Sequence, residues 1–267
     1  MLTYLYLDYG GVPKYRQELK YSLISLKQEL RGEAAIAVYS DAPEVYRNWP
    51  VMAVGMAGQV AAWSGGGLYH RRVKPEVVKE ALARFAGPVC LLAADSIVRP
   101  GFHAEVTAKI ENSVVLHAFE HTNPYPPLSG FRCRLPHLGD YRYDAGNSVM
   151  YNSGLIGMRP EHAPLLDDVL AMIDALIGRA KKFPAMEQFA LSEALRLGQV
   201  PVAQVKATFL HYRQGRRRIY MANQIAKNLS PDWNDLTPPQ QWPHLNGWAV
   251  RAYNYYYGIT HALEFLR

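Results

Sequence analysis

The chain has 267 residues, of which 49% are hydrophobic and 19% charged, and this composition excludes an intrinsically disordered protein, because disordered chains are poor in apolar and aromatic residues. Its formal net charge of +6 favours an anionic partner but does not choose between nucleic acid, a phosphorylated ligand and an anionic lipid surface. Two cysteines, Cys90 and Cys133, exclude a disulfide framework and a cysteine-only zinc site, so we interpret both as reduced thiols of a cytoplasmic protein.

The first 115 residues alternate short apolar runs with segments of helical periodicity. The apolar runs predict strands at 3–8, 34–39, 51–56 and 88–94, and the recurrence of apolar residues predicts helices at 15–30 and 75–85. Strands that alternate with helices of this length form βαβ units. We therefore expect an α/β fold with a mostly parallel central sheet and helices on both of its faces.

The second half of the sequence changes rhythm. Strands are predicted at 113–119, 148–158 and 205–209, helices at 160–179 and 184–197, and an irregular, proline-rich segment at 120–147. The last residues hold an arginine cluster at 213–218, a loop rich in proline and tryptophan at 230–243 and a predicted terminal helix. No internal repeat or linker is visible, which favours one compact domain.

An aspartate follows each of three predicted strands, at Asp8, Asp41 and Asp95. In open α/β sheets ligands bind beyond the carboxyl ends of the strands, where these side chains are expected. A single aspartate after a strand is most often a turn or cap residue. Three such residues at one edge of a sheet predict a binding site.

Asp95 and His211 could hold a divalent cation. Asp95 ends the most apolar strand, and hard cations prefer oxygen ligands on rigid elements. His211 follows a late strand, and ions such as Mn²⁺ accept mixed nitrogen and oxygen ligands. The alternatives are a capping role for Asp95 and a structural hydrogen bond for His211.

Two further motifs place amide and carboxylate groups beside predicted elements. Residues 151–154 (YNSG) interrupt a strand pattern with small polar side chains, which suits close approach to a ligand or, alternatively, a β-bulge. Glu187 and Gln188 begin a helix, where an acid is also favoured by the helix dipole alone.

Basic residues cluster before the helix at Pro75, as Arg71, Arg72 and Lys74, and again at 213–218. Two such clusters could converge on a diphosphate, because arginine offers bidentate hydrogen bonds to phosphate. A nucleic-acid or lipid-headgroup surface is the alternative. The sequence contains no P-loop, no GxGxxG fingerprint, no GxSxG elbow and no recognisable nucleic-acid-binding motif, so we expect no nucleic-acid partner.

Five short motifs in chain order resemble the GT-A-fold nucleotide-sugar glycosyltransferases, and within them family 8, the group that is similar to glycogenin and to the bacterial lipopolysaccharide galactosyltransferases. These motifs are Asp8 after the first strand, LLAADS at 91–96, YNSG at 151–154, EQFAL at 187–191 and HYRQG at 211–215. The resemblance implies a GT-A-like catalytic domain over residues 1–215. A basic and aromatic C-terminal extension, 216–267, is expected to pack on it.

The resemblance also implies a role for each matching residue. The implied catalytic residues are Gln188, Glu187 and Asn152, and the implied donor-binding residues are Asp8, Tyr9, Arg72, Lys74, Asp95, Ser96, Ser153 and Gly154. Asp95 and His211 correspond to ligands of Mn²⁺ or Mg²⁺. Ala93 stands where the family has the first aspartate of its Asp-x-Asp motif, so the basic clusters could instead offset the missing cation.

The function implied by the resemblance is transfer of a sugar from a nucleotide-diphosphate donor, UDP-linked, to a glycan or lipid-linked acceptor with retention of configuration. The alternatives are a metal-independent or inverting transferase and an inactive sugar-nucleotide or glycan-binding protein. We expect a cytoplasmic location. The remaining basic residues and the C-terminal aromatic residues could stack on sugars or, alternatively, meet a lipid-linked acceptor in a peripheral membrane contact. These aromatic residues are Trp233, Trp242, Trp248 and Tyr253 to Tyr257.

Overall fold

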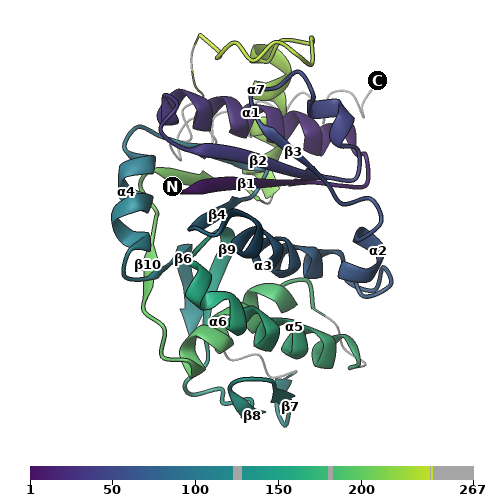
Figure 1. Cartoon of the computed structure of the whole chain (residues 1–267), viewed down its shortest axis with the longest axis vertical. Helices are drawn as coiled ribbons and strands as arrows, with labels where there is room; N and C mark the ends of the chain where they lie inside the picture. Colours follow the sequence, from purple (N-terminus) through teal and green to yellow (C-terminus); the bar gives the residue numbers. More distant parts are fainter. Residues whose placement is uncertain (123–127, 180–182, 214, 241, 243–267) are drawn as a thin grey trace, which may run out of the picture.

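A seven-stranded sheet forms the centre of the computed structural model, with the strand order β10-β6-β9-β4-β1-β2-β3 (Figure 1). The structure describes residues 1–122, 128–179, 183–213, 215–240 and 242. The strands of this sheet are β1 (Thr3–Asp8), β2 (Ala35–Ser40), β3 (Met52–Gly55), β4 (Val89–Leu92), β6 (Val114–Thr122), β9 (Val149–Met158) and β10 (Val202–Gln204). Only β9 runs against its neighbours β4 and β6, whereas every other pair in the sheet is parallel. The predicted mostly parallel α/β sheet is confirmed.

Helices cover both faces of this sheet, as predicted. One face packs against α1 (Pro13–Leu30) and α4 (Phe102–Ile110), and the other against α3 (Val73–Phe85), α5 (Ala163–Ile177) and α6 (Met186–Leu197). Shorter helical turns are η1 (Pro43–Tyr46), α2 (Val60–Trp63), η2 (His70–Arg72) and η4 (Pro160–His162).

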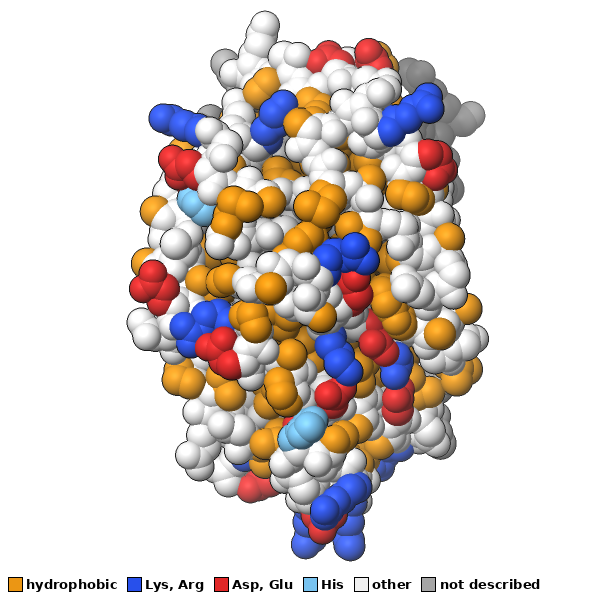
Figure 2. Space-filling view, in the orientation of Figure 1, with side chains coloured by type: hydrophobic (Ala, Val, Ile, Leu, Met, Phe, Trp, Pro, Cys, Tyr) orange, Lys and Arg blue, Asp and Glu red, His pale blue; other side chains and the backbone are white. Residues whose placement is uncertain are grey.

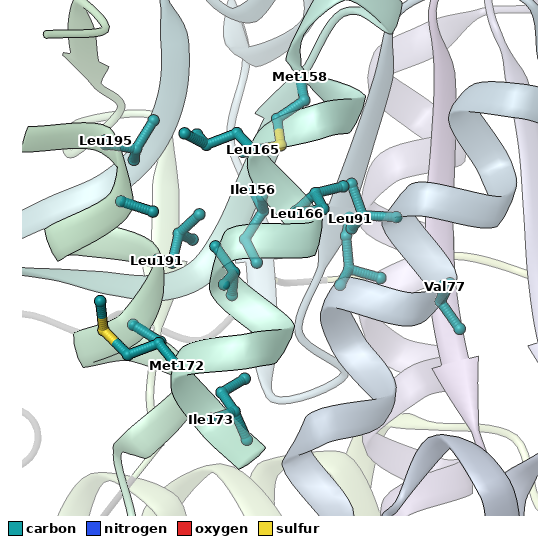
Figure 3. Close-up of a cluster of buried hydrophobic side chains, with 14 of the residues drawn as sticks. Val77, Leu91, Ile156, Met158, Leu165, Leu166, Met172, Ile173, Leu191 and Leu195 are labelled. Atoms are coloured by element: carbon teal, nitrogen blue, oxygen red, sulfur yellow. The ribbon is translucent and has the colours of Figure 1, made fainter. Parts of the chain in front are cut away.

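The pleat of β1 shows how the sheet separates two cores. Tyr4 and Tyr6 are buried in the core below α1 and α4, while Leu5 between them is buried in the core below α3, α5 and α6. Successive side chains of a strand point to opposite faces, so a fully apolar strand supplies both cores. Figure 3 shows the second core, where Leu166 of α5 and Leu191 of α6 pack around Ile156 of β9.

Two small sheets correct the sequence-based assignment. The strand predicted at 205–209 is wrong in its bounds, because β10 of the main sheet ends at Gln204 and β11 (Phe209–His211) begins only at the last predicted residue. β11 pairs antiparallel with β5 (Ser96–Val98) and not with the main sheet. The apolar run was misleading because Val205 and Phe209 are both buried although the chain changes sheets between them. The segment predicted to be irregular contains a hairpin of β7 (Arg132–Leu135) and β8 (Gly139–Arg142).

Three residues of the arginine cluster, 216–218, lie on a helix, α7 (Gly215–Asn228), that the sequence analysis did not predict, and Arg213 precedes it. Helix α7 packs against α1. The loop that follows is fastened to α1, because Lys20 donates to the carbonyl oxygens of Ser230 at 3.2 Å and Asp232 at 2.5 Å. Trp233 stacks on Trp49 with ring centroids 4.5 Å apart.

Trp242 donates its indole N–H to the Gln28 side chain and meets Tyr21 edge-on. The two described tryptophans of the extension, Trp233 and Trp242, therefore pack onto the protein. Trp248, Tyr253 to Tyr257 and the predicted terminal helix lie outside the described residues.

Part of the positive charge gathers on the β7–β8 hairpin, at the opposite end of the molecule from α7 (Figures 1 and 2). Arg132, Arg134 and Arg142 of this hairpin are exposed. Within the described part of the chain, no helix combines the length and the apolar character needed to cross a membrane.

Candidate functional site

A pocket of about 550 Å³ opens beside the carboxyl ends of β1 and β4, a volume typical of small-molecule sites. Because β9 runs antiparallel, the first half of this strand reaches the same edge of the sheet and brings Ser153 to the pocket. Eight predicted site residues line it, namely Asp8, Tyr9, Lys74, Asp95, Ser153, Glu187, Gln188 and His211. The wall also includes His70, Arg71, Arg213 and Arg218.

Asp8 lies at the end of β1 and is only 4% exposed. Its Oδ2 atom accepts three hydrogen bonds, from Arg16 Nε at 3.0 Å, Ser40 Oγ at 3.2 Å and the Tyr46 hydroxyl at 2.8 Å. These contacts compensate a buried carboxylate, which would otherwise be costly. Asp8 is thereby fixed at one end of the pocket.

Asp41, the other predicted strand-end acid near this edge, has a local role. Its carboxylate accepts a hydrogen bond from the backbone N–H of Gly10 at 2.8 Å. This is the turn-stabilising alternative that a lone aspartate after a strand favours. Asp41 is not among the residues that line the pocket.

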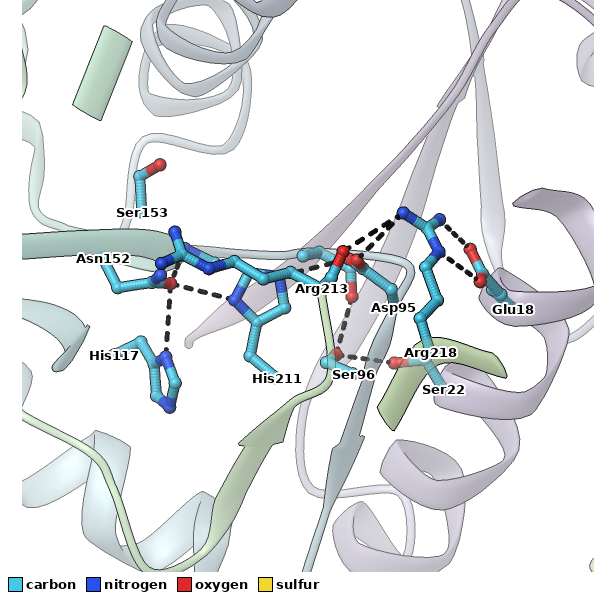
Figure 4. Close-up of polar contacts among 12 residues, drawn as sticks. Glu18, Ser22, Asp95, Ser96, His117, Asn152, Ser153, His211, Arg213 and Arg218 are labelled. Carbon is cyan, nitrogen blue, oxygen red and sulfur yellow. Dashed lines mark hydrogen bonds and ion pairs between the residues drawn. The ribbon is translucent and has the colours of Figure 1, made fainter. Parts of the chain in front are cut away.

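The pairing of β11 with β5 places His211 beside Asp95. His211 is opposite Ser96 in this register, and the backbone N–H of Tyr212 donates to the Asp95 carbonyl. Nε2 of His211 then lies 3.2 Å from Oδ1 of Asp95, and Nη1 of Arg218 lies 3.6 Å from Oδ2 (Figure 4).

Burial by itself raises the pKa of the Asp95 carboxyl. The hydrogen bond from His211 and the charges of His211, Arg218 and Lys74 outweigh burial, so the pKa is lowered. Asp95 is therefore an ionised carboxylate at neutral pH.

Asn152 of β9 orients the imidazole of His211. Its Oδ1 atom accepts from the Gly154 backbone at 2.9 Å and lies 2.9 Å from Nδ1 of His211 and 3.2 Å from Nδ1 of His117. Its Nδ2 atom donates to Glu120 at 2.8 Å. Asn152 is buried behind the pocket, so it positions the groups that line the pocket.

Glu187 and Gln188 lie in the first turn of α6 and are 3% and 4% exposed. Glu187 accepts hydrogen bonds from Tyr69 and from Ser153 Oγ at 3.3 Å, and its Oε1 lies 3.5 Å from the Lys74 ammonium. Both carboxylate oxygens of Glu187 are thus engaged.

The amide of Gln188 is fixed on both sides. Its oxygen accepts from the Ser153 backbone at 3.3 Å, and its nitrogen donates to Glu120 at 2.5 Å. The orientation of this amide in the pocket is therefore set by hydrogen bonds to β9 and β6.

Glu120, near the end of β6, is the main site residue that the sequence analysis missed. Its carboxylate accepts from Asn152 and Gln188 and forms an ion pair with Arg213 at 2.5 Å. It follows an apolar strand in the same way as Asp8 and Asp95, and that signal could have identified it.

Besides Asn152, three predicted residues do not reach the pocket surface. Arg72 points away and pairs with Asp174 and Glu76, both at 2.7 Å. Ser96 is fully buried below the pocket, where its hydroxyl donates to the Ala93 carbonyl at 2.6 Å.

Gly154 is the third of these residues, and it adjoins His211 so closely that a Cβ atom there would lie 2.2 Å from Nδ1. It contributes by leaving room for the imidazole, whereas the pocket wall is formed by its neighbours.

The donor set of the predicted metal site does not fit a resident Mn²⁺ or Mg²⁺. The described residues include no group of three or more histidine, cysteine, aspartate or glutamate side chains that could hold a metal ion. Asp95 and His211 are joined by a hydrogen bond, Ala93 supplies no ligand, and a guanidinium lies beside the second oxygen of Asp95. A hard divalent cation prefers several oxygen ligands, and this site offers one carboxylate.

No family model matches the chain, and no curated protein sequence matches it. Among the matching solved structures, the galactosyltransferase LgtC in complex with donor and acceptor sugar analogues is 12% identical, with a TM-score of 0.48 over 91% of this chain and 98% of the other. The bifunctional glycosyltransferase WbbM, solved without ligand, is also 12% identical, with a TM-score of 0.45 over 76% of this chain and 38% of the other.

Both of these similar structures are glycosyltransferases, the class that the sequence motifs resemble. An identity of 12% and TM-scores below 0.5 do not assign an activity to this chain. Its function is inferred from the side chains of its own pocket.

Proposed function

We propose that the chain is a glycosyltransferase that moves a sugar from a UDP-linked donor to a glycan or lipid-linked acceptor, with retention of configuration, in the cytoplasm. The observation that carries this proposal is the composition of one pocket. It has a fixed acid, Asp8, at one end, an oriented amide, Gln188, with Glu187 beside it, and a wall that includes Lys74 and several arginines.

This arrangement matches the needs of glycosyl transfer from a nucleotide diphosphate. The leaving diphosphate gains negative charge as the anomeric bond breaks, and preoriented cations stabilise that charge. The sugar becomes oxocarbenium-like, so positioning contributes more than a strong nucleophile does. Basic side chains along the pocket, with Gln188 and Glu187 at its edge, supply both functions.

The proposed roles follow from hydrogen-bonding capacity. Asp8, with Oδ2 saturated by three donors, would accept a base N–H through its other oxygen. Glu187, already engaged by Tyr69, Lys74 and Ser153, would hold the donor sugar, because a carboxylate so occupied is a poor general base. Gln188 would lie near the reacting face of the sugar. An inverting reaction would require Glu187 to act as the base.

A screen of UDP-sugars with glycan and lipid-linked acceptors tests this proposal. We expect hydrolysis or transfer with at least one UDP-sugar, and NMR of the product should show the anomeric configuration of the donor. Asp95→Ala and His211→Ala should each weaken donor binding or turnover. Wild-type kinetics in both variants would refute the site assignment, and inversion of the anomer would refute retention.

A second candidate is a sugar-nucleotide-binding protein without catalytic activity. It is favoured by Ala93, which leaves the family-like motif with a single carboxylate at Asp95. Binding of UDP-sugars by calorimetry, without hydrolysis or transfer to any acceptor, would establish this candidate instead.

A further inference from the structure

The pocket wall includes Arg218, whose side chain is held in one orientation, unlike a flexible surface arginine. Arg218 of α7 donates from Nε to Glu18 Oε1 at 2.9 Å and from Nη2 to Glu18 Oε2 at 2.5 Å. Its guanidinium also lies over the Tyr15 ring, 5.2 Å from the centroid. A bidentate carboxylate pair and an aromatic face together fix the orientation of the guanidinium plane.

The clamp leaves one edge of Arg218 directed at the pocket. Nη1 is the nitrogen that Glu18 does not engage, and it lies 3.6 Å from Asp95 Oδ2 and 3.4 Å from the carbonyl oxygen of Arg213 (Figure 4). Glu18 on α1 is 2% exposed, so the carboxylate that holds Arg218 has no competing contact with bulk water. A fixed positive charge therefore lies beside the carboxylate that the sequence motif assigns to a metal ion.

Two other cations of the pocket wall are committed to carboxylates deeper in the site. Lys74 lies 3.5 Å from Glu187, and Arg213 lies 2.5 Å from Glu120. At Asp95, where the donor set does not fit a divalent ion, the guanidinium of Arg218 lies beside one carboxylate oxygen and His211 is hydrogen-bonded to the other.

We propose that Arg218, clamped by Glu18, is the fixed cation that binds the diphosphate of the donor in place of a divalent metal ion. This inference rests on the proposed function. Arginine N–H groups match phosphate oxygens, and a cation already held in position requires no reorganisation when charge develops.

In the reaction, the bond between the anomeric carbon and the β-phosphate oxygen breaks, and its electron pair leaves on the diphosphate beside Arg218. The acceptor hydroxyl oxygen forms the new bond to the anomeric carbon, and its proton passes to the departing diphosphate. Arg218 stabilises the charge of the leaving group throughout this exchange without gaining or losing a proton.

The test is calorimetric titration of the full chain with UDP, in buffer containing EDTA and again in buffer containing MnCl₂. We expect the wild-type dissociation constant to change less than threefold between the two buffers. Arg218→Gln should weaken UDP binding about 10- to 100-fold in EDTA, the effect of losing a charge-assisted contact. Arg217→Gln, an exposed neighbour on the same helix with the same loss of charge, should change binding less than twofold.

Removing Arg218 alone leaves the buried Glu18 carboxylate unpaired and could unfold the protein. The double variant Glu18→Gln with Arg218→Gln removes both charges together, and thermal unfolding shows whether it is folded. The folded double variant should bind UDP as weakly as Arg218→Gln. Glu18→Gln alone retains the cation but loses its clamp, and an intermediate loss is expected.

Two results would overturn the role of Arg218 while leaving the proposed function intact. One is UDP binding by the wild type that weakens threefold or more in EDTA, and the other is equal affinity of the folded double variant and Arg217→Gln. No binding of UDP, GDP, ADP or CDP in either buffer would instead overturn the proposed function, and the role of Arg218 with it.

Discussion

Gly154 offers the sharpest test of the site geometry. An alanine Cβ at this position would lie 2.2 Å from Nδ1 and 2.5 Å from Cε1 of His211, and 2.8 Å from Oδ1 of Asn152. The β9 backbone cannot yield easily, because the Gly154 carbonyl accepts from Ala93 in the centre of the sheet at 2.8 Å. His211 must therefore move by about 1 Å or more to reach an ordinary contact distance of roughly 3.5 Å.

Such a movement disrupts the contacts of His211 with Asn152 and Asp95, which measure 2.9 and 3.2 Å. Overpacking of this kind costs about 1–3 kcal/mol. At roughly 2–4 °C per kcal/mol for a domain of this size, Gly154→Ala should lower Tm by roughly 2–12 °C. It should also weaken UDP binding at least tenfold, because the Asp95 end of the pocket loses its imidazole.

Gly157→Ala on the same strand is the matched control. Its Cβ would lie 3.0 Å from Val115 Cβ and 3.3 Å from Ile110 Cδ1, in the apolar core. We expect a loss of stability within the same range and unchanged affinity for UDP, measured by thermal unfolding and calorimetry. Wild-type Tm and affinity in Gly154→Ala would refute the placement of His211 against this strand.

Three further predictions concern other parts of the chain. Glu120→Gln should reduce turnover about 10- to 100-fold in a UDP-sugar transfer assay. The glutamine keeps one acceptor oxygen for two amide donors, so either Asn152 or Gln188 loses its partner, and small displacements of reacting groups are costly; unchanged turnover would contradict this role. Lys20→Met removes the donor to two carbonyl oxygens of the loop after α7. It should lower the free energy of unfolding by about 1–3 kcal/mol and speed chymotrypsin cleavage of that loop. Lys27→Met changes an exposed lysine on the same helix and should do neither. His162 accepts the Arg159 backbone N–H at 3.1 Å, and burial lowers the pKa of its imidazole. As the pH falls below about 6.5, the unfolded chain therefore takes up the proton first and the folded state loses stability. The Tm difference between wild type and His162→Asn should shrink or reverse from pH 7.5 to pH 5, and a constant difference would disprove this effect.

The edge of the sheet that carries the pocket could be predicted because it depends only on which residues directly follow each strand in the sequence. Carboxyl ends of parallel strands meet at one edge, so acids that directly follow apolar runs were expected together, and Asp8 and Asp95 do line one pocket. The motif on β9 joins them because that strand runs the other way. Neither inference needs information about which helix packs where.

Contacts between distant segments were not predictable in this way. The pair Glu18–Arg218 joins residues that are 200 positions apart, and no pattern of neighbouring residues predicts it. Helix α7 was missed because it begins with a glycine and three arginines, a pattern that resembles a surface loop. Arg72 and Lys74 illustrate a finer limit, since residues two apart near a helix start point to opposite sides, and only Lys74 reaches the pocket.

The clamp between α1 and α7 has a consequence for the order in which the molecule is assembled. Glu18 and Lys20 belong to the first helix, yet their partners Arg218, Ser230 and Asp232 come 200 to 212 residues later. Closing a loop of that length costs conformational entropy before any contact is gained, and non-local contacts form slowly. During synthesis the early strands of the sheet can pair while the pocket still lacks Arg218. A nascent chain that ends before α7 should therefore form much of its sheet without binding a diphosphate. Affinity for a diphosphate would then show that α7 has packed against α1.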